Sequence, residues 1–232
     1  MNGEIFIAIV SNAILLMSLA VLYSVFPSKM KLSYFLRKTI MGISVGIIGL
    51  LVMYNHVAIE NGIIFDGRSI VMILSGMFFG LIPTIIGAIP LIIYRISVGG
   101  AGVIPGIIWI VIPAIIGLIW RKARLKTENN DMGKIKFYEL YLLILATQSL
   151  MVIILFLFPN KVPVGAINTV AAPLILFYPL SGFLVSVFML RIRQSYFQSI
   201  NIIQKEKEYN QLFNNNAVYT LIVDPVTMKI EN

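Results

Sequence analysis

An apolar stretch with an arginine near each end lies in the middle of this sequence: DGRSIVMILSGMFFGLIPTIIGAIPLIIYRISVGG, residues 66–100. Gly80-Leu-Ile-Pro83, near its centre, is typical of a turn, because glycine and proline interrupt regular structure. We therefore predict a helical hairpin in which Arg68 opens one arm and Arg95 closes the other. The two guanidinium groups would then lie close together in space.

The composition predicts an all-α polytopic membrane protein. Of the 232 residues, 59% are hydrophobic, and several apolar runs reach the ~20 residues that a helix needs to cross a bilayer. The chain has no cysteine and a single histidine, His56, which excludes thiolate chemistry and multi-histidine metal sites, so no cofactor is expected. The net charge of +8 is explained by basic cytoplasmic loops, and no nucleic acid partner is expected.

Basic residues separate the apolar segments and set their direction. Six apolar segments lie at about 4–26, 39–55, 68–97, 103–120, 138–158 and 165–190. Three basic clusters hold 14 of the 18 lysines and arginines: Lys29–Lys38, Arg121–Lys136 and Arg191–Lys207. The positive-inside rule places all three clusters in the cytoplasm.

That placement favours an additional turn within the third segment. Segment 39–55 leaves the cytoplasm, so the chain must return by Arg121, which takes an odd number of further crossings. A hairpin with arms at about 64–80 and 82–97 satisfies this and gives seven crossings, with the N-terminus outside and the C-terminus inside. Six spans are the alternative. Each arm is short, so a tilted or partly re-entrant arm is a further alternative.

The two arginines have two interpretations. An arginine at the centre of a membrane helix costs about 2.5–3.5 kcal/mol on insertion scales, and two like charges repel unless an anion lies between them. The first interpretation is a small anionic ligand held by both guanidinium groups, with Asp66 and Glu60 close by. In the second, both arginines reach the outer headgroups and Arg68 pairs with Asp66.

The stretch resembles the five-transmembrane receptor domain of LytS type, 5TMR-LYT, and the resemblance covers about residues 39–190. That family has an N-x-R motif, then a Gly/Pro-rich hairpin, then an H-R-x-x-x-G-G element. Here the first motif reads Asp66-Gly67-Arg68, and the second reads Tyr94-Arg95-Ile-Ser-Val-Gly99-Gly100. Asp66 and Tyr94 stand where the family has asparagine and histidine.

The resemblance implies a sensor domain with a ligand site. Family members are input domains of histidine kinases and diguanylate cyclases, and some LytS-type kinases are linked to autolysis and cell-wall control. One such sensor binds pyruvate, and the two arginines match positions implicated in that recognition. A cysteine and a serine that complete the family site fall at Gly106 and Trp109, so the ligand stays open among small carboxylates. The implied site comprises Arg68, Arg95, Asp66, Tyr94, Gly99, Gly100, Gly106 and Trp109.

The residues after the last span predict a cytoplasmic helix and a short β segment. Ile192, Tyr196, Ser199 and Ile203 form an imperfect apolar stripe, typical of a solvated helix or of a homodimeric coiled coil. AVYTLIVDPVTMKIEN, residues 217–232, predicts a strand, an Asp-Pro turn and a second strand, and it is similar to the opening of a PAS domain. We therefore expect the chain to be the N-terminal part of a longer protein. The expected parts are a first helix with its basic loop at 1–38, the sensor domain at 39–190, a signalling helix at 191–212 and the PAS-like start at 213–232.

The sequence thus predicts the membrane input module of a bacterial-type signalling protein in the plasma membrane. Its expected partners are a small anionic metabolite such as a pyruvate-like carboxylate, the lipid bilayer, and a second copy in the full-length protein. No kinase or cyclase motif is present in these residues. The alternative is a solute-capture component of a transporter, because subunits of vitamin uptake systems share a similar Gly/Pro hairpin. The PAS-like tail favours the sensor.

Overall fold

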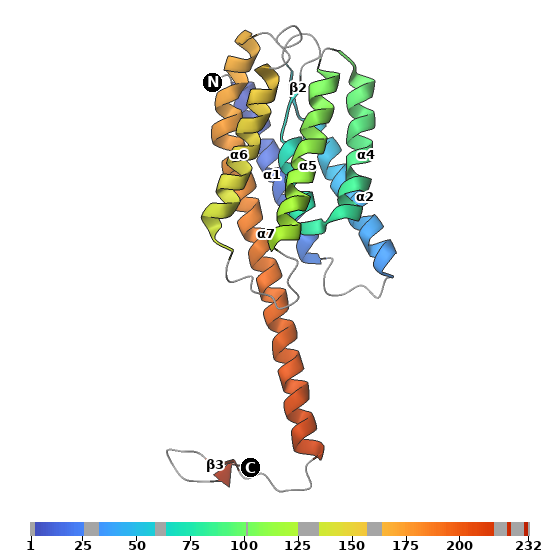
Figure 1. Cartoon of the computed structure of the whole chain (residues 1–232), viewed down its shortest axis with the longest axis vertical. Helices are drawn as coiled ribbons and strands as arrows, with labels where there is room; N and C mark the ends of the chain where they lie inside the picture. Colours follow the sequence, from blue (N-terminus) through green and yellow to red (C-terminus); the bar gives the residue numbers. More distant parts are fainter. Residues whose placement is uncertain are drawn as a thin grey trace. The chain divides into compact units, whose positions relative to one another are not determined.

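The computed structural model describes residues 3–25, 33–58, 64–100, 102–124, 135–156, 164–215, 222–223 and 230–231. The chain divides into two compact units, Met1–Arg193 and Gln194–Asn232. In the first unit the long helices run up and down side by side, and a short helical segment lies among them (Figure 1). The second unit contains the end of the last helix and a short pair of strands.

Seven α-helices occur in the described part of the chain. They are α1 (Gly3–Val25), α2 (Tyr34–Tyr54), α3 (Arg68–Leu74), α4 (Leu81–Val98), α5 (Val103–Arg124), α6 (Phe137–Phe156) and α7 (Val164–Asn215). Five of these helices contain segments long and apolar enough to cross a membrane: Tyr34–Tyr54, Leu81–Val98, Val103–Arg124, Phe137–Ile154 and Ile175–Gln211. Val10–Ser24 and Arg68–Phe79 are shorter apolar helical segments. The predicted all-α polytopic architecture is confirmed.

The predicted hairpin turns at Gly80. A five-residue π-helix, η1 (Ser75–Phe79), continues α3, and the N–H of Gly80 donates to the carbonyl oxygen of Ser75 at 3.1 Å. Gly80 has a φ of +89°, a left-handed conformation that favours glycine. Helix α4 follows at once. The alternative in which residues 68–97 form one continuous span is therefore wrong.

The first arm of the hairpin is partly extended. Strands β1 (Val57–Ala58) and β2 (Ile64–Phe65) pair antiparallel, and β2 leads into the interior of the bundle before α3 begins (Figure 1). At about 1.5 Å per residue, α3 and η1 together extend about 18 Å, whereas a hydrocarbon core measures about 30 Å. Every residue of α3 and η1 is buried. The α3–η1 segment is thus a central helix enclosed by protein, as expected for a helix that is apolar all round.

Glycines let the neighbouring helices approach this centre. A Cβ atom on Gly76 would lie 2.6 Å from the carbonyl oxygen of Ala114, and one on Gly117 would overlap the carbonyl oxygen of Ile73. Helices α3–η1 and α5 therefore meet backbone to backbone, as small residues allow in membrane proteins. Helices α2 and α4 also meet at a glycine, because a Cβ atom on Gly46 of α2 would lie 2.8 Å from the ring of Pro90 in α4.

Helix α4 separates the interior of the bundle from its surroundings. Its inward residues are buried, and they include Pro83, Gly87, Leu91 and Arg95. Its outward residues are more than half exposed, and they include Leu81, Ile85, Ile89 and Ile93. An exposed apolar stripe of this length fits contact with lipid acyl chains.

The basic clusters share one end of the first unit. Arg37 and Lys38 lie where α2 begins, Arg121 and Arg124 where α5 ends, and Lys136 directly before α6. These helix ends lie at the same end of the bundle in Figure 1, and we call this the basic end. The described residues of the first two basic clusters thus lie at the same end of the bundle, and the cytoplasmic placement of all three clusters stays a prediction.

The second unit contains the end of α7, which is continuous with the last apolar span, and one pair of short strands. Helix α7 extends to Asn215, and Ile200, Ile203 and Tyr209 on it are exposed. Strand β3 (Ile222–Val223) pairs antiparallel with β4 (Ile230–Glu231). The predicted Asp-Pro turn lies outside the described residues. Self-association through α7 and a PAS fold stay predictions.

Candidate ligand site around two buried arginines

The turn that starts α3 holds a fully buried ion pair. The Asp66 carboxylate accepts hydrogen bonds from the backbone N–H of Arg68 at 2.9 Å and from its Nε at 2.8 Å, and its second oxygen pairs with Nη2. Gly67 is the N-cap residue and gives no side-chain cap, so Asp66 supplies the acceptor from one position earlier. Both side chains have 0% exposure. The predicted pairing is confirmed, but Arg68 is enclosed by protein instead of extended toward headgroups.

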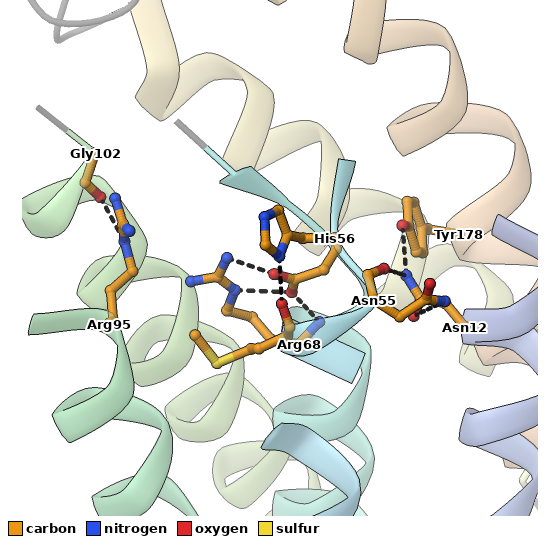
Figure 2. Close-up of polar contacts among 9 residues, drawn as sticks. Asn12, Asn55, His56, Arg68, Arg95, Gly102 and Tyr178 are labelled. Atoms are coloured by element: carbon orange, nitrogen blue, oxygen red, sulfur yellow. Dashed lines mark hydrogen bonds and ion pairs between the residues drawn. The ribbon is translucent and has the colours of Figure 1, made fainter. Parts of the chain in front are cut away.

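Arg95 lies in the last turn of α4 and is held against α5. Its Nε donates to the carbonyl oxygen of Gly102 at 3.1 Å (Figure 2), and its side chain is 1% exposed. A Cβ atom on Gly106 would overlap Nε of Arg95 and would lie 2.7 Å from its Cδ. The arginine stem therefore rests directly on the backbone of α5, and only glycine at position 106 leaves that room.

The loop between α4 and α5 depends on left-handed backbone conformations. Gly99 has a φ of +69° and Gly100 a φ of +80°, values that residues with a Cβ rarely adopt. The reversal brings Gly102 back to Arg95. Space is not the constraint at Gly99, because a Cβ there would meet nothing within 4 Å. The observed role of these glycines is to form the turn, and their contact with a ligand stays a prediction.

Trp109 brings a buried donor to the same region. It lies one helical turn after Gly106, is 3% exposed, and packs edge-to-face on Phe65 with ring centroids 5.1 Å apart. Phe65 directly precedes Asp66, so this contact joins α5 to the ion-paired turn. The indole Nε1 has no hydrogen-bond acceptor among the described residues. Leaving a buried donor unsatisfied costs about 1–3 kcal/mol, which makes this N–H a candidate ligand contact.

The charges of this region do not balance among the described residues. Asp66, Arg68 and Arg95 are the buried charged side chains there, giving two positive charges and one negative charge. Arg95 is repelled by Arg68 and attracted by Asp66. Figure 2 shows the guanidinium of Arg68 directed toward the side of the bundle on which Arg95 lies. Guanidinium groups are forked donors that bind carboxylates, so two of them in one buried region are a candidate anion site.

The remaining predicted residues lie at the edge of this region or outside it. Tyr94 is partly buried and packs against an apolar cluster made of Met53, Met72, Leu91, Ile110 and Ala114. Glu60 lies outside the described residues. The ring Nδ1 of His56 lies 2.8 Å from the carbonyl oxygen of Met53 (Figure 2).

A polar network links the start of α3 to α7. The amide of Asn12 donates to the Tyr178 hydroxyl and to the carbonyl oxygen of Asn55, both at 3.3 Å (Figure 2). A Cβ on Gly67 would lie 3.2 Å from the Tyr178 ring, so this tyrosine packs directly against the ion-paired turn. Sequence reasoning missed the network. The signal was present, because amides inside apolar spans usually bond between helices.

Two further contacts connect α3 with the last two helices. Ser69 and Gln148 exchange hydrogen bonds at 3.0 and 3.2 Å, which ties α3 to α6. Gly182 of α7 packs against Ile70, since a Cβ there would lie 3.0 Å from Cγ2 of Ile70. The four residues from Gly67 to Ile70 thus contact α6 and α7 as well as the arginine region.

The family model for the 5TMR of 5TMR-LYT matches residues 8–193, most of the chain. The chain belongs to the 5TMR-LYT family. The match includes α1, which the sequence analysis had set apart from the sensor domain. No curated protein and no solved structure matches the chain. No group of three or more metal-ligating side chains occurs within the described ranges. Domains of this family are non-catalytic membrane sensors, typical of the input modules of signalling proteins.

Proposed function

We propose that this 5TMR-LYT domain detects a small anionic ligand, most simply a monocarboxylate, bound between Arg68, Arg95 and Trp109. The observation that carries the proposal is the buried indole N–H of Trp109, which has no acceptor among the described residues, in a region that also holds two buried guanidinium groups. A carboxylate supplies one negative charge and up to four acceptor lone pairs, which match the forked donors of arginine.

Signalling would run from α3 to α7. A ligand that draws Arg68 toward Arg95 alters the Asp66–Arg68 turn, and Gly67 in that turn packs on Tyr178 of α7. Helix α7 is a single helix from Val164 to Asn215, so it provides a direct mechanical route out of the membrane domain. We propose a PAS-like domain as the next receiver, because residues 217–232 are similar in sequence to the opening of such a domain, followed by a kinase or cyclase in the parent protein.

The orientation is part of the proposal. We infer that the basic end faces the cytoplasm and that the Gly99–Gly102 loop faces outward, because basic residues cluster at one end. Single cysteines at Asn130 and Ala101 test this in intact cells with an impermeant thiol reagent. We expect labelling at Ala101 only, and labelling at Asn130 only would reverse the orientation.

Ligand binding is tested by thermal unfolding of the purified chain in detergent with a panel of small carboxylates that includes pyruvate. At least one carboxylate should raise the melting temperature. Arg95→Lys keeps the charge but removes the planar fork, and a charged hydrogen bond contributes about 1.5–3 kcal/mol. The apparent affinity of this variant should therefore fall about tenfold or more.

Arg124→Lys is the matched control for that experiment. Arg124 lies at the basic end, half exposed, in a surface pair with Glu139, so its change should leave the carboxylate affinity unaltered. Equal behaviour of the Arg95 and Arg124 variants would refute a ligand role for Arg95. A second check is Glu60→Gln: if this change destabilises the protein without any ligand, Glu60 supplies the missing charge and the proposal fails.

A further inference from the structure

A second cationic site lies at the basic end, independent of the arginine region. A pocket of about 230 Å³ opens below the Gly80 turn. It is lined by Tyr34, Lys38, Phe79, Gly80, Leu81, Ile82, Pro83 and Arg121. Two of these residues are cationic and none is acidic. The pocket is therefore a positively charged recess at the joint between η1 and α4.

Backbone carbonyl groups, which carry no formal charge, position both cations. The Nη1 atom of Arg121 donates to the carbonyl oxygens of Met77 and Phe78 at 3.1 and 2.7 Å. The Nζ atom of Lys38 donates to the carbonyl oxygen of Phe79 at 3.0 Å. These contacts fix the two side chains in place, and no carboxylate pairs with either cation in the described part of the chain. Lys38 is also repelled by Arg37 and Arg193, which adds to the positive potential.

The first turn of α4 adds backbone donors to the same pocket. Gly80 is the N-cap residue, and no side chain caps the helix there. The N–H groups of the first helical turn have no partner within a helix, and those of Leu81 and Ile82 belong to residues that line the pocket. The N-terminus of a helix carries partial positive charge. Two side-chain cations and an uncapped helix start therefore meet in one recess.

We propose that this pocket binds a phosphate group, carried either by an anionic phospholipid headgroup or by a free phosphate. Phosphate presents several oxygens to donors from different directions, which fits an arginine, a lysine and a helix N-terminus together. The rim favours the lipid: Tyr34 is 63% exposed and Leu81 is 59% exposed, and these apolar surfaces continue into the outward stripe of α4. A headgroup in the pocket would place its acyl chains along that stripe.

The test measures thermal unfolding of the purified chain in neutral detergent at constant ionic strength. Phosphatidylglycerol, phosphatidylcholine and inorganic phosphate are titrated separately. Phosphatidylglycerol should raise the melting temperature, and phosphatidylcholine should not. Lys38→Gln retains a donor for the Phe79 carbonyl group, and Arg121→Lys retains the charge. Each variant should weaken the apparent affinity for phosphatidylglycerol about tenfold.

Lys122→Gln is the matched control, because Lys122 is an exposed cation next to Arg121 that does not line the pocket. It should bind phosphatidylglycerol as the unaltered chain does.

The two anions distinguish the source of the phosphate group. If inorganic phosphate stabilises the chain with the same dependence on Lys38, the source is free phosphate. If only phosphatidylglycerol stabilises the chain, the source is lipid. Equal losses in Lys38→Gln and Lys122→Gln, or no stabilisation by either anion, would overturn the proposal. Carboxylate binding at the arginine region should persist in Lys38→Gln, so the two proposals fail separately.

Discussion

The central α3–η1 helix has cations at both ends, but they meet opposite poles of the helix dipole. At the C-terminal end, Lys38 and Arg121 donate to the last carbonyl groups. Those carbonyl groups lack helical partners and carry partial negative charge, so cations stabilise the fold there. At the N-terminal end, Arg68 is the first residue of α3, where the partial charge is positive and a carboxylate would be favoured.

The difference separates cations that stabilise a helix end from a cation that the helix end does not require. Lys38 and Arg121 donate to carbonyl groups at a helix end, so they contribute to the stability of the fold in addition to the phosphate binding proposed for them. Arg68 lies at the unfavourable end of the dipole of its own helix, although the Asp66 carboxylate pairs with it. The stability of the helix therefore does not require a cation at Arg68, and the anion site proposed above would give it a role.

The largest effect is expected from Asp66→Asn. This change removes the carboxylate that pairs with Arg68, and breaking a buried ion pair costs about 3–5 kcal/mol. The melting temperature in detergent should fall sharply. Without the Asp66 carboxylate, the site has one negative charge fewer beside its two guanidinium groups. Anionic ligands should therefore stabilise the variant more than they stabilise the unaltered chain.

Arg124→Gln is the comparison at the basic end. It breaks the surface pair with Glu139, in which Arg124 is 51% exposed, and exposed pairs contribute about 1 kcal/mol or less. Glu139 keeps its hydrogen bond from Trp120. If Asp66→Asn costs no more than Arg124→Gln, the N-terminal region is not under electrostatic strain and the contrast between the two ends fails.

Changes at Trp109 and Trp120 test the same comparison between the two ends of the central helix, and the expected effect is smaller. Trp109→Phe removes a buried N–H that has no acceptor in the described part of the chain, while the ring can still pack on Phe65. The stability without ligand should stay equal or rise slightly. The ligand affinity should fall about threefold to tenfold, as expected for the loss of one hydrogen bond of about 0.5–1.5 kcal/mol.

Trp120→Phe is the matched change at the basic end. Its indole N–H donates to Glu139 at 2.9 Å, so this variant should lose stability and keep its carboxylate affinity. Ligand titrations monitored by thermal unfolding measure both quantities in one experiment. The opposite pattern, with Trp109→Phe unstable and its affinity unchanged, would assign Trp109 a packing role only.

Local residues predicted the hairpin and the placement of the arginines at helix ends. Gly80 with Pro83 marks a turn by its own chemistry, and the Asp-Gly-Arg spacing brings a carboxylate to the adjacent arginine without help from the fold. The burial of Arg68 could not be predicted in the same way. A terminal arginine reaches the headgroups or turns inward depending on which helices surround it, and here β2 carries the start of α3 into the bundle.

Contacts between distant segments were the least predictable part. Asn12 and Gln148 signal from sequence that a partner exists, because an amide in an apolar span needs one. Their partners, Tyr178 and Ser69, lie 166 and 79 residues away, and only the packed helices select them. The π-helix was equally unpredictable, since a shift from the ordinary helical hydrogen-bond pattern reflects the fit of Ser75–Phe79 among neighbouring helices.

The smallest effect on binding is expected from Tyr178→Phe, which tests coupling and not recognition. The change removes the hydroxyl that accepts from Asn12 but keeps the ring against Gly67. Losing an ordinary hydrogen bond to the ligand would cost about 1 kcal/mol. Because the hydrogen bond removed here does not touch the ligand, the ligand affinity should change less than about twofold. What should weaken is the response of α7, measured as the ligand-induced change in hydrogen exchange over residues 191–211. Tyr141→Phe provides the control, because Tyr141 packs edge-to-face on Phe183 of α7 at 5.7 Å, away from Gly67. If both variants retain the full exchange response, the contact between Gly67 and Tyr178 does not transmit the signal, and the route must run through Ser69 and α6 instead.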